Sequence, residues 1–291
     1  MAGLSFVILY PILQKISIAI KDKSDLYSPI VVFIPEHFSW DNFSKAISIM
    51  DYGHTLINTF TLSMVTTILT AVSCAFAGYA FARLKFKGSN WLFGGVILTI
   101  LVPPTTILIP IYMNLKDFSL MGLLPLLTGK SVNLLDSYWP FILTSLTANS
   151  LKAGLYIFIF RQFFRGIPKE MEEAAYIDGA SVSKTFLRVM LPNAVPAIVT
   201  VLLFSFVWQW NDSFFTTTYL TSSKVMSTQL ASLPHNLSIL LEGGVATNKD
   251  PFYMSMVQDT GVLLAILPLI IIYLFVQRYF VESIERTGIV G

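Results

Sequence analysis

Charged residues are scarce in this chain of 291 residues. Asp, Glu, Lys and Arg make up 12% of it, against about 25% in an ordinary soluble domain. Hydrophobic residues make up 54%. This composition predicts a membrane protein. The formal net charge is only +2, so bulk electrostatics indicates neither a nucleic acid nor an acidic polymer as a partner.

Cysteine and histidine are also rare. Cys74 is the only cysteine and lies in an apolar run, which excludes an internal disulfide and a thiolate metal site, so we interpret it as a packing residue. His37, His54 and His235 show no ligand-like spacing with each other or with nearby carboxylates. No nucleophile, carboxylate pair or metal cluster is persuasively spaced at membrane depth, which disfavours an intramembrane enzyme.

Long apolar runs are abundant instead. A spanning helix needs about 20 mostly apolar residues. Six stretches meet that standard: Gly3–Ile20, Thr55–Ala82, Trp91–Met113, Trp139–Phe160, Ala194–Phe215 and Gly261–Val281. The sequence therefore predicts an all-α polytopic membrane protein with six transmembrane helices, forming a single transmembrane domain over residues 1–291.

Basic residues predict how these helices are oriented. Lys and Arg in short loops mark the cytoplasmic side. Basic clusters follow the second and the fourth apolar stretch: Arg83, Lys85 and Lys87, then Arg161, Arg165 and Lys169. Both termini are then expected in the cytoplasm. Three extracytoplasmic loops are expected at about residues 21–54, 114–138 and 216–260, which suggests an outer partner or gate.

One stretch between two apolar runs is strongly polar. Nine charged residues lie between Arg161 and Pro192, and each would cost about 2.5 to 3.5 kcal/mol at the middle of a bilayer. The stretch is therefore expected in the cytoplasm. Its proline, acidic residues and glycine predict a short helix over Pro168–Asp178, ended by Gly179 in a left-handed conformation. Ser181 or Ser183 can cap a second short helix.

The first short helix has a face of small residues. Met171, Ala174, Ala175 and Asp178 share that face at spacings of three and four residues, and small side chains there would let another backbone approach closely. Spacing alone leaves two alternatives open. The segment is either a helical hairpin on the membrane surface or a docking surface for a partner that periodicity does not name.

A longer pattern in this stretch resembles a known signature. Glu173-Ala174-Ala175, then Gly179 after three residues, and Leu191-Pro192 further on resemble the EAA motif of ABC importer permeases. Val189 stands where that motif usually has isoleucine. Other stretches resemble the carbohydrate-importer branch, specifically the MalG-type subunit: Tyr79–Gly88, Phe160–Ser181, Trp210–Asp212 and Gln277–Gly291. The resemblance covers nearly the whole chain, although the outer loop near 117–138 is longer than usual in that family.

The resemblance implies a type I ABC importer permease fold and a set of partners. The EAA segment, about residues 166–192, would be a coupling-helix pair that fits a cleft in a cytoplasmic ATPase. Residues assigned to ATPase coupling are Glu173, Ala174, Ala175, Asp178, Gly179, Leu191 and Pro192. The implied partners are a second homologous permease, an ATP-binding cassette ATPase dimer and an extracytoplasmic solute-binding protein. A sugar or oligosaccharide would be imported across a bacterial cytoplasmic (inner) membrane.

The chain is not expected to be an enzyme. TGKS at Thr128–Ser131 matches only the end of a phosphate-binding loop, because Leu124 stands where that loop requires glycine. We therefore expect no cofactor in this chain, with ATP and Mg²⁺ bound by the partner ATPase. The alternative function is an ion-coupled secondary transporter of a small solute. That class places acids or histidines within its helices, whereas only Lys15 and Lys152 lie in or beside the apolar stretches, without obvious acid partners.

The outer end of the fifth apolar stretch is a candidate translocation path or outer gate. It carries Trp208, Trp210, Asn211 and Asp212. Aromatic rings stack on sugars, and amides and carboxylates bind hydroxyls, but tryptophan is also common at membrane interfaces, so an aromatic-belt role stays open. The resemblance favours a structural or gate role for Asp212. It also implies that loop 221–259 probes the binding protein and that tail 285–291 runs along the ATPase interface.

Overall fold

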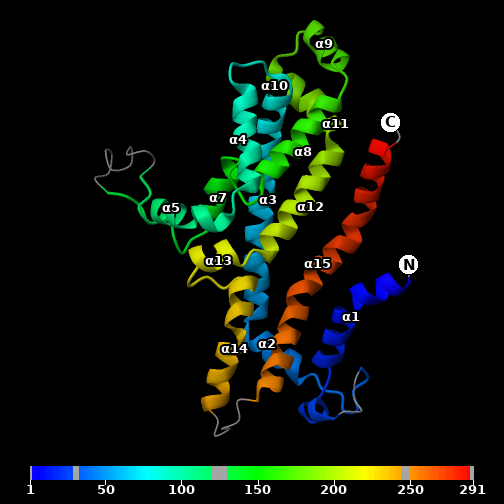
Figure 1. The fold of residues 1–291 in the computed structure, drawn as a ribbon, viewed down its shortest axis with the longest axis vertical. Helices are drawn as coiled ribbons and strands as arrows, with labels where there is room; N and C mark the ends of the chain where they lie inside the picture. Colours follow the sequence, from blue (N-terminus) through cyan, green and yellow to red (C-terminus); the bar gives the residue numbers. More distant parts are fainter. Residues whose placement is uncertain (1, 29–32, 120–129, 244–249, 289–291) are drawn as a thin grey trace. The chain divides into compact units, whose positions relative to one another are not determined.

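The computed structural model describes residues 2–28, 33–119, 130–243 and 250–288 (Figure 1). Some predicted features lie outside those ranges: part of each predicted outer loop, Leu124, Thr128 and Gly129 of the TGKS stretch, and the last three residues. Within them the regular structure is helical, apart from isolated β-bridges that pair Lys21 with Phe38 and Phe118 with Val132. The chain divides into two compact units, residues 1–60 with 222–275 and residues 61–221 with 276–291. The single domain over residues 1–291 stays a prediction.

The first unit is built from the two ends of the sequence. Its helices are α1 (Ala2–Ala19), α2 (Asp41–Ile49), the start of α3 (Tyr52–Arg83), α14 (Met226–Gly243) and most of α15 (Pro251–Gly288), with a short 3₁₀ turn at Lys23–Tyr27. α15 packs tightly on α14, because a Cβ on Gly261 would lie 2.6 Å from Cδ2 of Leu233. The loop predicted over 216–260 thus contains an ordered helix, α14.

The second unit holds the candidate functional segments. After α3 it contains α4 (Ser89–Leu101), α5 (Pro104–Lys116), α7 (Trp139–Leu146), α8 (Ala153–Gly166), α9 (Glu170–Ile177), α10 (Val182–Thr185), a π turn (Phe186–Met190), α11 (Leu191–Asn193), α12 (Val195–Asn211) and α13 (Phe214–Tyr219). α9 lies at one end of the bundle of α3, α4, α8 and α12 (Figure 1).

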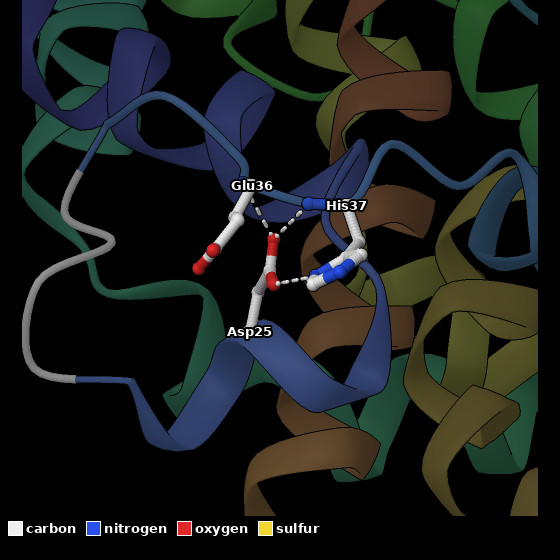
Figure 2. Close-up of side chains that lie close together, drawn as sticks. All are labelled: Asp25, Glu36 and His37. Carbon is white, nitrogen blue, oxygen red and sulfur yellow. Dashed lines mark hydrogen bonds and ion pairs between the residues drawn. The ribbon is translucent and has the colours of Figure 1, made fainter.

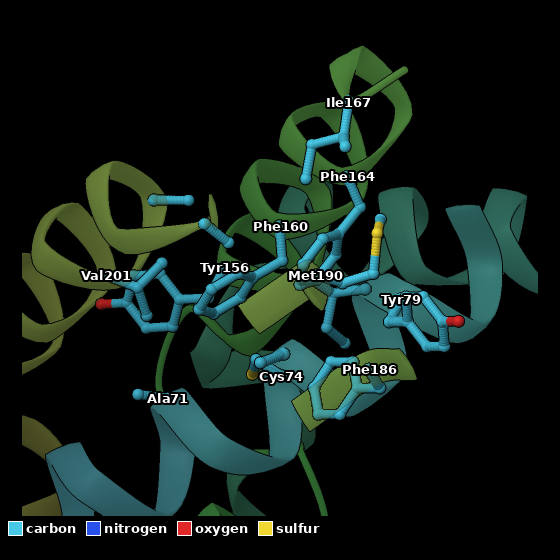
Figure 3. Close-up of a cluster of buried hydrophobic side chains, with 14 of the residues drawn as sticks. Ala71, Cys74, Tyr79, Tyr156, Phe160, Phe164, Ile167, Phe186, Met190 and Val201 are labelled. Carbon is cyan, nitrogen blue, oxygen red and sulfur yellow. The ribbon is translucent and has the colours of Figure 1, made fainter. Parts of the chain in front are cut away.

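Aromatic side chains fill the core of this second unit (Figure 3). Phe160 and Phe164 of α8 are fully buried and pack with Phe186 of the π turn. The Cys74 side chain is fully buried in the same cluster, in agreement with its interpretation as a packing residue. A Cβ on Gly78 would lie 2.5 Å from Cβ of Phe160, so α3 and α8 approach closely there.

Several helices are long and apolar enough to cross a membrane. Among the described residues, Tyr52–Arg83 and Pro251–Gln277 each pass that test alone. Two bent pairs pass it together: Ser89–Leu101 with Pro104–Lys116, and Val182–Asn193 with Val195–Asn211. Gly3–Ala19 is a shorter apolar helix. The membrane-protein prediction is confirmed, while the count of six spans stays a prediction.

Three of the predicted spans are not single helices. The third breaks at Val102 and Pro103, where α4 and α5 are bent by 104°. Consecutive prolines cause this break, because proline lacks an amide donor and disfavours a helical conformation in the residue before it. The fourth breaks between α7 and α8, where Ala148 and Lys152 have φ of 54° and 64°. The fifth ends as a helix at Asn211, and α13 follows.

Candidate functional site

The EAA segment forms the two short helices that its sequence predicts, with a shorter first helix. α9 covers Glu170–Ile177 instead of Pro168–Asp178. Gly179 has φ of +77°, its N–H donates to the carbonyl of Tyr176 at 3.0 Å, and Ala180 N–H donates to the carbonyl of Ala175 at 2.9 Å. This pair of bonds is a Schellman motif, which confirms the left-handed role predicted for Gly179.

The second part of the segment is a short helix that continues through a π turn. Of the two serines that could cap it, Ser181 does so: its Oγ accepts the N–H of Lys184 at 3.4 Å. In the π turn, Phe186 packs on Tyr79 with ring centroids 4.9 Å apart. Single π turns are frequent at functional sites. The chain then passes through α11 and bends by 78° at Ala194 into α12.

Glu172 attaches α9 to the helix bundle, and sequence reasoning missed it. Its Oε2 lies 3.1 Å from Nε of Arg83, and the two side chains are only 9% and 8% exposed. The hydroxyl of Tyr79 donates to Oε1 of Glu172 at 3.0 Å, and Arg83 also donates to the carbonyl of Ile167. A buried pair of this kind costs about 3–5 kcal/mol when one partner alone is removed. Helical spacing gives no signal for it, because the partners are far apart in the sequence.

The exposed face of α9 differs from the predicted one. Ala175 is buried against the bundle, whereas Met171, Ala174 and Asp178 are exposed as expected. Ile177, 86% exposed, adds an apolar side chain to this face. The reason for the error is that Ala175 lies on the same side as Glu172, which pairs with Arg83 and turns that side inward.

The other predicted coupling residues lie on or beside the exposed surface. Glu173 is exposed, and a Cβ on Gly179 would meet nothing within 4 Å, so only the backbone conformation restricts that position. Leu191 is half-buried and Pro192 exposed at the start of α11. α9 therefore presents an acidic and apolar surface while Glu172 holds its opposite side.

The structure does not bring the four predicted path residues together. Trp210 is buried and packs on Phe206 with ring centroids 5.7 Å apart. Trp208 is half-exposed, and its ring lies 4.9 Å from Nζ of Lys152. Asn211 is exposed and donates to the carbonyl of Val207 at 2.8 Å. The four residues therefore lie in different environments and do not form the cluster that the sequence predicts.

Asp212 is buried and has a clear structural role. Its carboxylate accepts the N–H of Phe215 at 3.3 Å and, from Thr216, the N–H at 2.9 Å and the hydroxyl at 2.7 Å. These bonds satisfy the free donors at the start of α13. Asp212 also borders a cavity of about 280 Å³.

The expectation that Lys15 lacks an acid partner is wrong. In the first unit its amine pairs with Asp259 of α15. The acid is distant in sequence, and the pairing depends on α1 packing against α15. A charge within an apolar helix is costly unless an opposite charge pairs with it, as Asp259 pairs with Lys15.

His37, in the outer loop predicted over 21–54, contacts Asp25, which its sequence spacing did not predict (Figure 2). The buried Asp25 carboxylate accepts the N–H of Glu36 at 2.9 Å and of His37 at 2.8 Å, and Nδ1 of His37 lies 2.9 Å away. Hydrogen bonds from the His37 backbone and ring lower the pKa of Asp25, and its hydrogen bond to Asp25 raises the pKa of His37. Both Asp25 oxygens are occupied by these bonds, so we interpret the cluster as a loop closure rather than a metal site.

Comparison with known proteins identifies the family. Residues 68–286 match the family described as "Binding-protein-dependent transport system inner membrane component". The melibiose/raffinose/stachyose import permease protein MelC of Bacillus subtilis is 27% identical over 94% of this chain and 88% of its own length. The trehalose transport system permease protein SugB of Mycobacterium tuberculosis is 26% identical over 97% of this chain and 93% of its own.

A solved structure shares the fold. A chain from a bacterial ABC transporter involved in the import of the acidic polysaccharide alginate has a TM-score of 0.67 and 22% sequence identity, covering 96% of this chain and 93% of that one. The two chains therefore share the same overall helical fold. With the family match over residues 68–286, this shows that the chain belongs to the binding-protein-dependent transport system inner membrane components, the permease subunits of ABC importers.

Proposed function

We propose that this chain forms half of the translocation pathway of a bacterial importer for a sugar or oligosaccharide. A second homologous permease completes the pathway, an ATPase dimer binds ATP and Mg²⁺, and an extracytoplasmic binding protein delivers the cargo. The names of relatives support a carbohydrate: MelC is a melibiose, raffinose and stachyose permease, and SugB a trehalose permease. Another relative, GgtD of Synechocystis, is named for osmoprotective compounds and is 27% identical over 85% of this chain.

The proposed coupling depends on the two sides of α9. Its exposed side, with Glu173, Ala174 and Ile177, docks in a cleft of the ATPase. Its buried side is tied to α3 through Glu172 and Arg83. Closure of the ATPase dimer would then move α9 as a rigid lever, because a helix fixed by a buried ion pair transmits displacement instead of absorbing it.

The chain that follows α9 gives that movement a second route, because the Gly179 turn links α9 to α10. α10, the π turn and α11 follow one another without a loop, and the chain bends by 78° at Ala194 into α12. Displacement of α9 would shift α3 and α12 together and switch the cavity between inward and outward access. This orientation has α9 and both termini in the cytoplasm, as the basic residues predict.

The observation that carries this proposal is the buried attachment of an otherwise exposed acidic helix. An ion-coupled secondary transporter has no use for such a helix, and family membership disfavours that alternative. The exposed side of α9 is also unsuited to lying on lipid, because Glu173 and Asp178 share it with Ile177.

The test uses the complete importer reconstituted in liposomes. Binding protein loaded with one of several sugars should stimulate ATP hydrolysis. Glu173→Lys should abolish the stimulation, whereas Glu36→Lys, a matched reversal of an exposed glutamate in the predicted outer loop, should preserve it. No response to any carbohydrate would overturn the substrate class, and normal stimulation in Glu173→Lys would overturn the coupling role.

A further inference from the structure

Three helix interruptions in the second unit meet at one cavity of about 280 Å³. Val102 and Pro103 border it at the α4–α5 break, Ala148–Lys152 at the α7–α8 break, and Asp212 at the α12–α13 junction. Irregular backbone inside a membrane is tolerated only where it is buried in protein or lines a water-filled cavity. Because three interruptions border the same space, we interpret them as parts of one site instead of three separate defects.

The α7–α8 loop that borders the cavity is held in an unusual conformation. Ala148 and Lys152 are non-glycine residues with positive φ, and both line the space. α3 fixes this loop from outside: Thr70 donates a hydrogen bond to Oγ of Ser150 at 2.9 Å, and Ser73 donates to the carbonyl of Ser145 at 2.6 Å. Strained backbone persists only where surrounding structure imposes it, and such positions cluster at binding sites.

One residue of the cavity lining, Gln209, has a buried polar atom without a hydrogen-bond partner among the described residues. This atom is the side-chain amide nitrogen, Nε2. A buried donor left unpaired is costly, so turning of the Gln209 side chain toward a ligand that accepts this hydrogen bond would be favoured. Asn149, also on the lining, supplies a second amide.

The charged groups at the wall are already engaged. The Asp212 carboxylate accepts hydrogen bonds from Phe215 and Thr216, and the Lys152 amine lies over the Trp208 ring. Apolar and aromatic side chains, among them Phe141, make up much of the remaining lining. An uncharged ligand with hydroxyl groups and one apolar face fits these groups, and a sugar ring has both.

We propose that this cavity is a subsite for a single uncharged sugar ring, in which the Gln209 side chain turns toward the space and its amide donates to a ring hydroxyl. The proposal rests on the proposed import function and adds which residues of this chain contact the cargo. Its volume of about 280 Å³ lies at the lower end of ligand pockets, which are about 300–1,000 Å³, so an oligosaccharide passes through it one ring at a time. Of the four path residues predicted from sequence, only Asp212 lines it.

The first test measures sugar imported per ATP hydrolysed by the complete importer in liposomes, with raffinose, trehalose and arabinotriose as probes. Gln209→Leu removes the donor at similar volume and should lower that ratio about tenfold, the effect of losing one hydrogen bond to a bound ligand. Gln258→Leu replaces an exposed glutamine outside the cavity lining and should keep the wild-type ratio. Equal ratios in the two variants would overturn the subsite.

A second measurement covers the case in which Gln209→Leu fails to assemble. Ser150→Cys places a thiol in the lining, and a charged, membrane-impermeant methanethiosulfonate reagent should label it more slowly while the sugar is being transported. Wild type is the unlabelled control, because its only cysteine, Cys74, is fully buried. If sugar does not change the labelling rate, the cavity is only a solvent pocket. If the thiol is protected even without sugar, another part of the protein covers it. Either result would overturn the subsite.

The two proposals fail in different ways. If no probe sugar stimulates ATP hydrolysis, the carbohydrate import function falls and the subsite falls with it. If a probe sugar stimulates hydrolysis and is imported, while Gln209→Leu behaves like Gln258→Leu and Ser150→Cys shows no protection, only the subsite is wrong.

Discussion

The coupling segment and the cavity show two opposite ways in which a polar group can sit in an apolar protein. In α9 the charges are exposed except for Glu172, which is paired with Arg83. At the cavity the charges are engaged, and the uncharged amide nitrogen of Gln209 has no partner in the part of the chain that the structure describes. The first arrangement suits a helix that binds a partner protein and moves with it as a rigid body. The second suits a place where a neutral molecule is held weakly and released.

The largest effect on stability and coupling is expected at Glu172, the one buried charge of α9. Glu172→Gln leaves the Arg83 guanidinium buried without its counter-charge, which should cost about 3–5 kcal/mol. We expect a lower unfolding temperature for the purified permease and loss of sugar-stimulated ATP hydrolysis. Glu173→Gln, one position along on the exposed side, should lose stimulation but keep the unfolding temperature. Equal unfolding temperatures in the two variants would contradict the anchoring role of Glu172.

A double variant sharpens that test. Replacing both partners of a buried pair with apolar side chains of similar size is often neutral. Arg83→Met with Glu172→Met should therefore recover part of the unfolding temperature that Glu172→Gln loses, while coupling stays impaired. A double variant no more stable than Glu172→Gln would show that the ion pair is not the source of the loss.

A smaller effect is expected at the turn that ends α9. Gly179 has φ of +77°, and a side chain in the left-handed region costs about 1–2 kcal/mol. Gly179→Val should therefore reduce coupling by displacing α9 without unfolding the bundle. Gly166→Val is the matched control, since that glycine also has open space around its Cβ but no positive φ. Similar ATP hydrolysis in both variants would contradict the conformational role of Gly179.

At the cavity, Asp212 should act through the helix that it caps. Asp212→Asn keeps an oxygen acceptor, whereas Asp212→Ala removes the cap, which is worth about 1 kcal/mol. The alanine variant should lower sugar import more than the asparagine variant. An equal and complete loss in both would indicate that the charge itself is needed and would contradict the capping interpretation.

The smallest effect is expected at the outer loop, far in sequence from both regions. The raised pKa of His37 means that its contribution to stability is lost as pH rises through that pKa. The lowered pKa of Asp25 means that its contribution is lost as pH falls through that pKa. Unfolding temperature should therefore be highest between the two, and His37→Gln should remove the loss on the alkaline side. A variant with an unchanged pH profile would exclude the pair as its cause.

The two regions also differ in how far the sequence predicts them. Caps and turns are local, so Ser181, Gly179 and the polarity of the EAA segment can be read from neighbouring residues. The partners of Glu172, Lys15 and His37 cannot be predicted from neighbouring residues, because only tertiary packing brings each pair together. The break at Pro103 has a visible cause in consecutive prolines. The break at Ala148–Lys152 has none, since alanine and lysine give no sign of positive φ.

The most direct test of the central claim is whether α9 touches the ATPase. Ala174→Cys places a single reactive thiol on the exposed side of α9, because Cys74 is buried. With a thiol-attached photo-crosslinker on the assembled importer, we expect an adduct between this chain and the ATPase. Ser44→Cys, exposed on α2 in the predicted outer loop, should give no such adduct. An importer that hydrolyses ATP normally but forms no adduct from Ala174→Cys, or forms one only from Ser44→Cys, would contradict the docking of α9 on the ATPase.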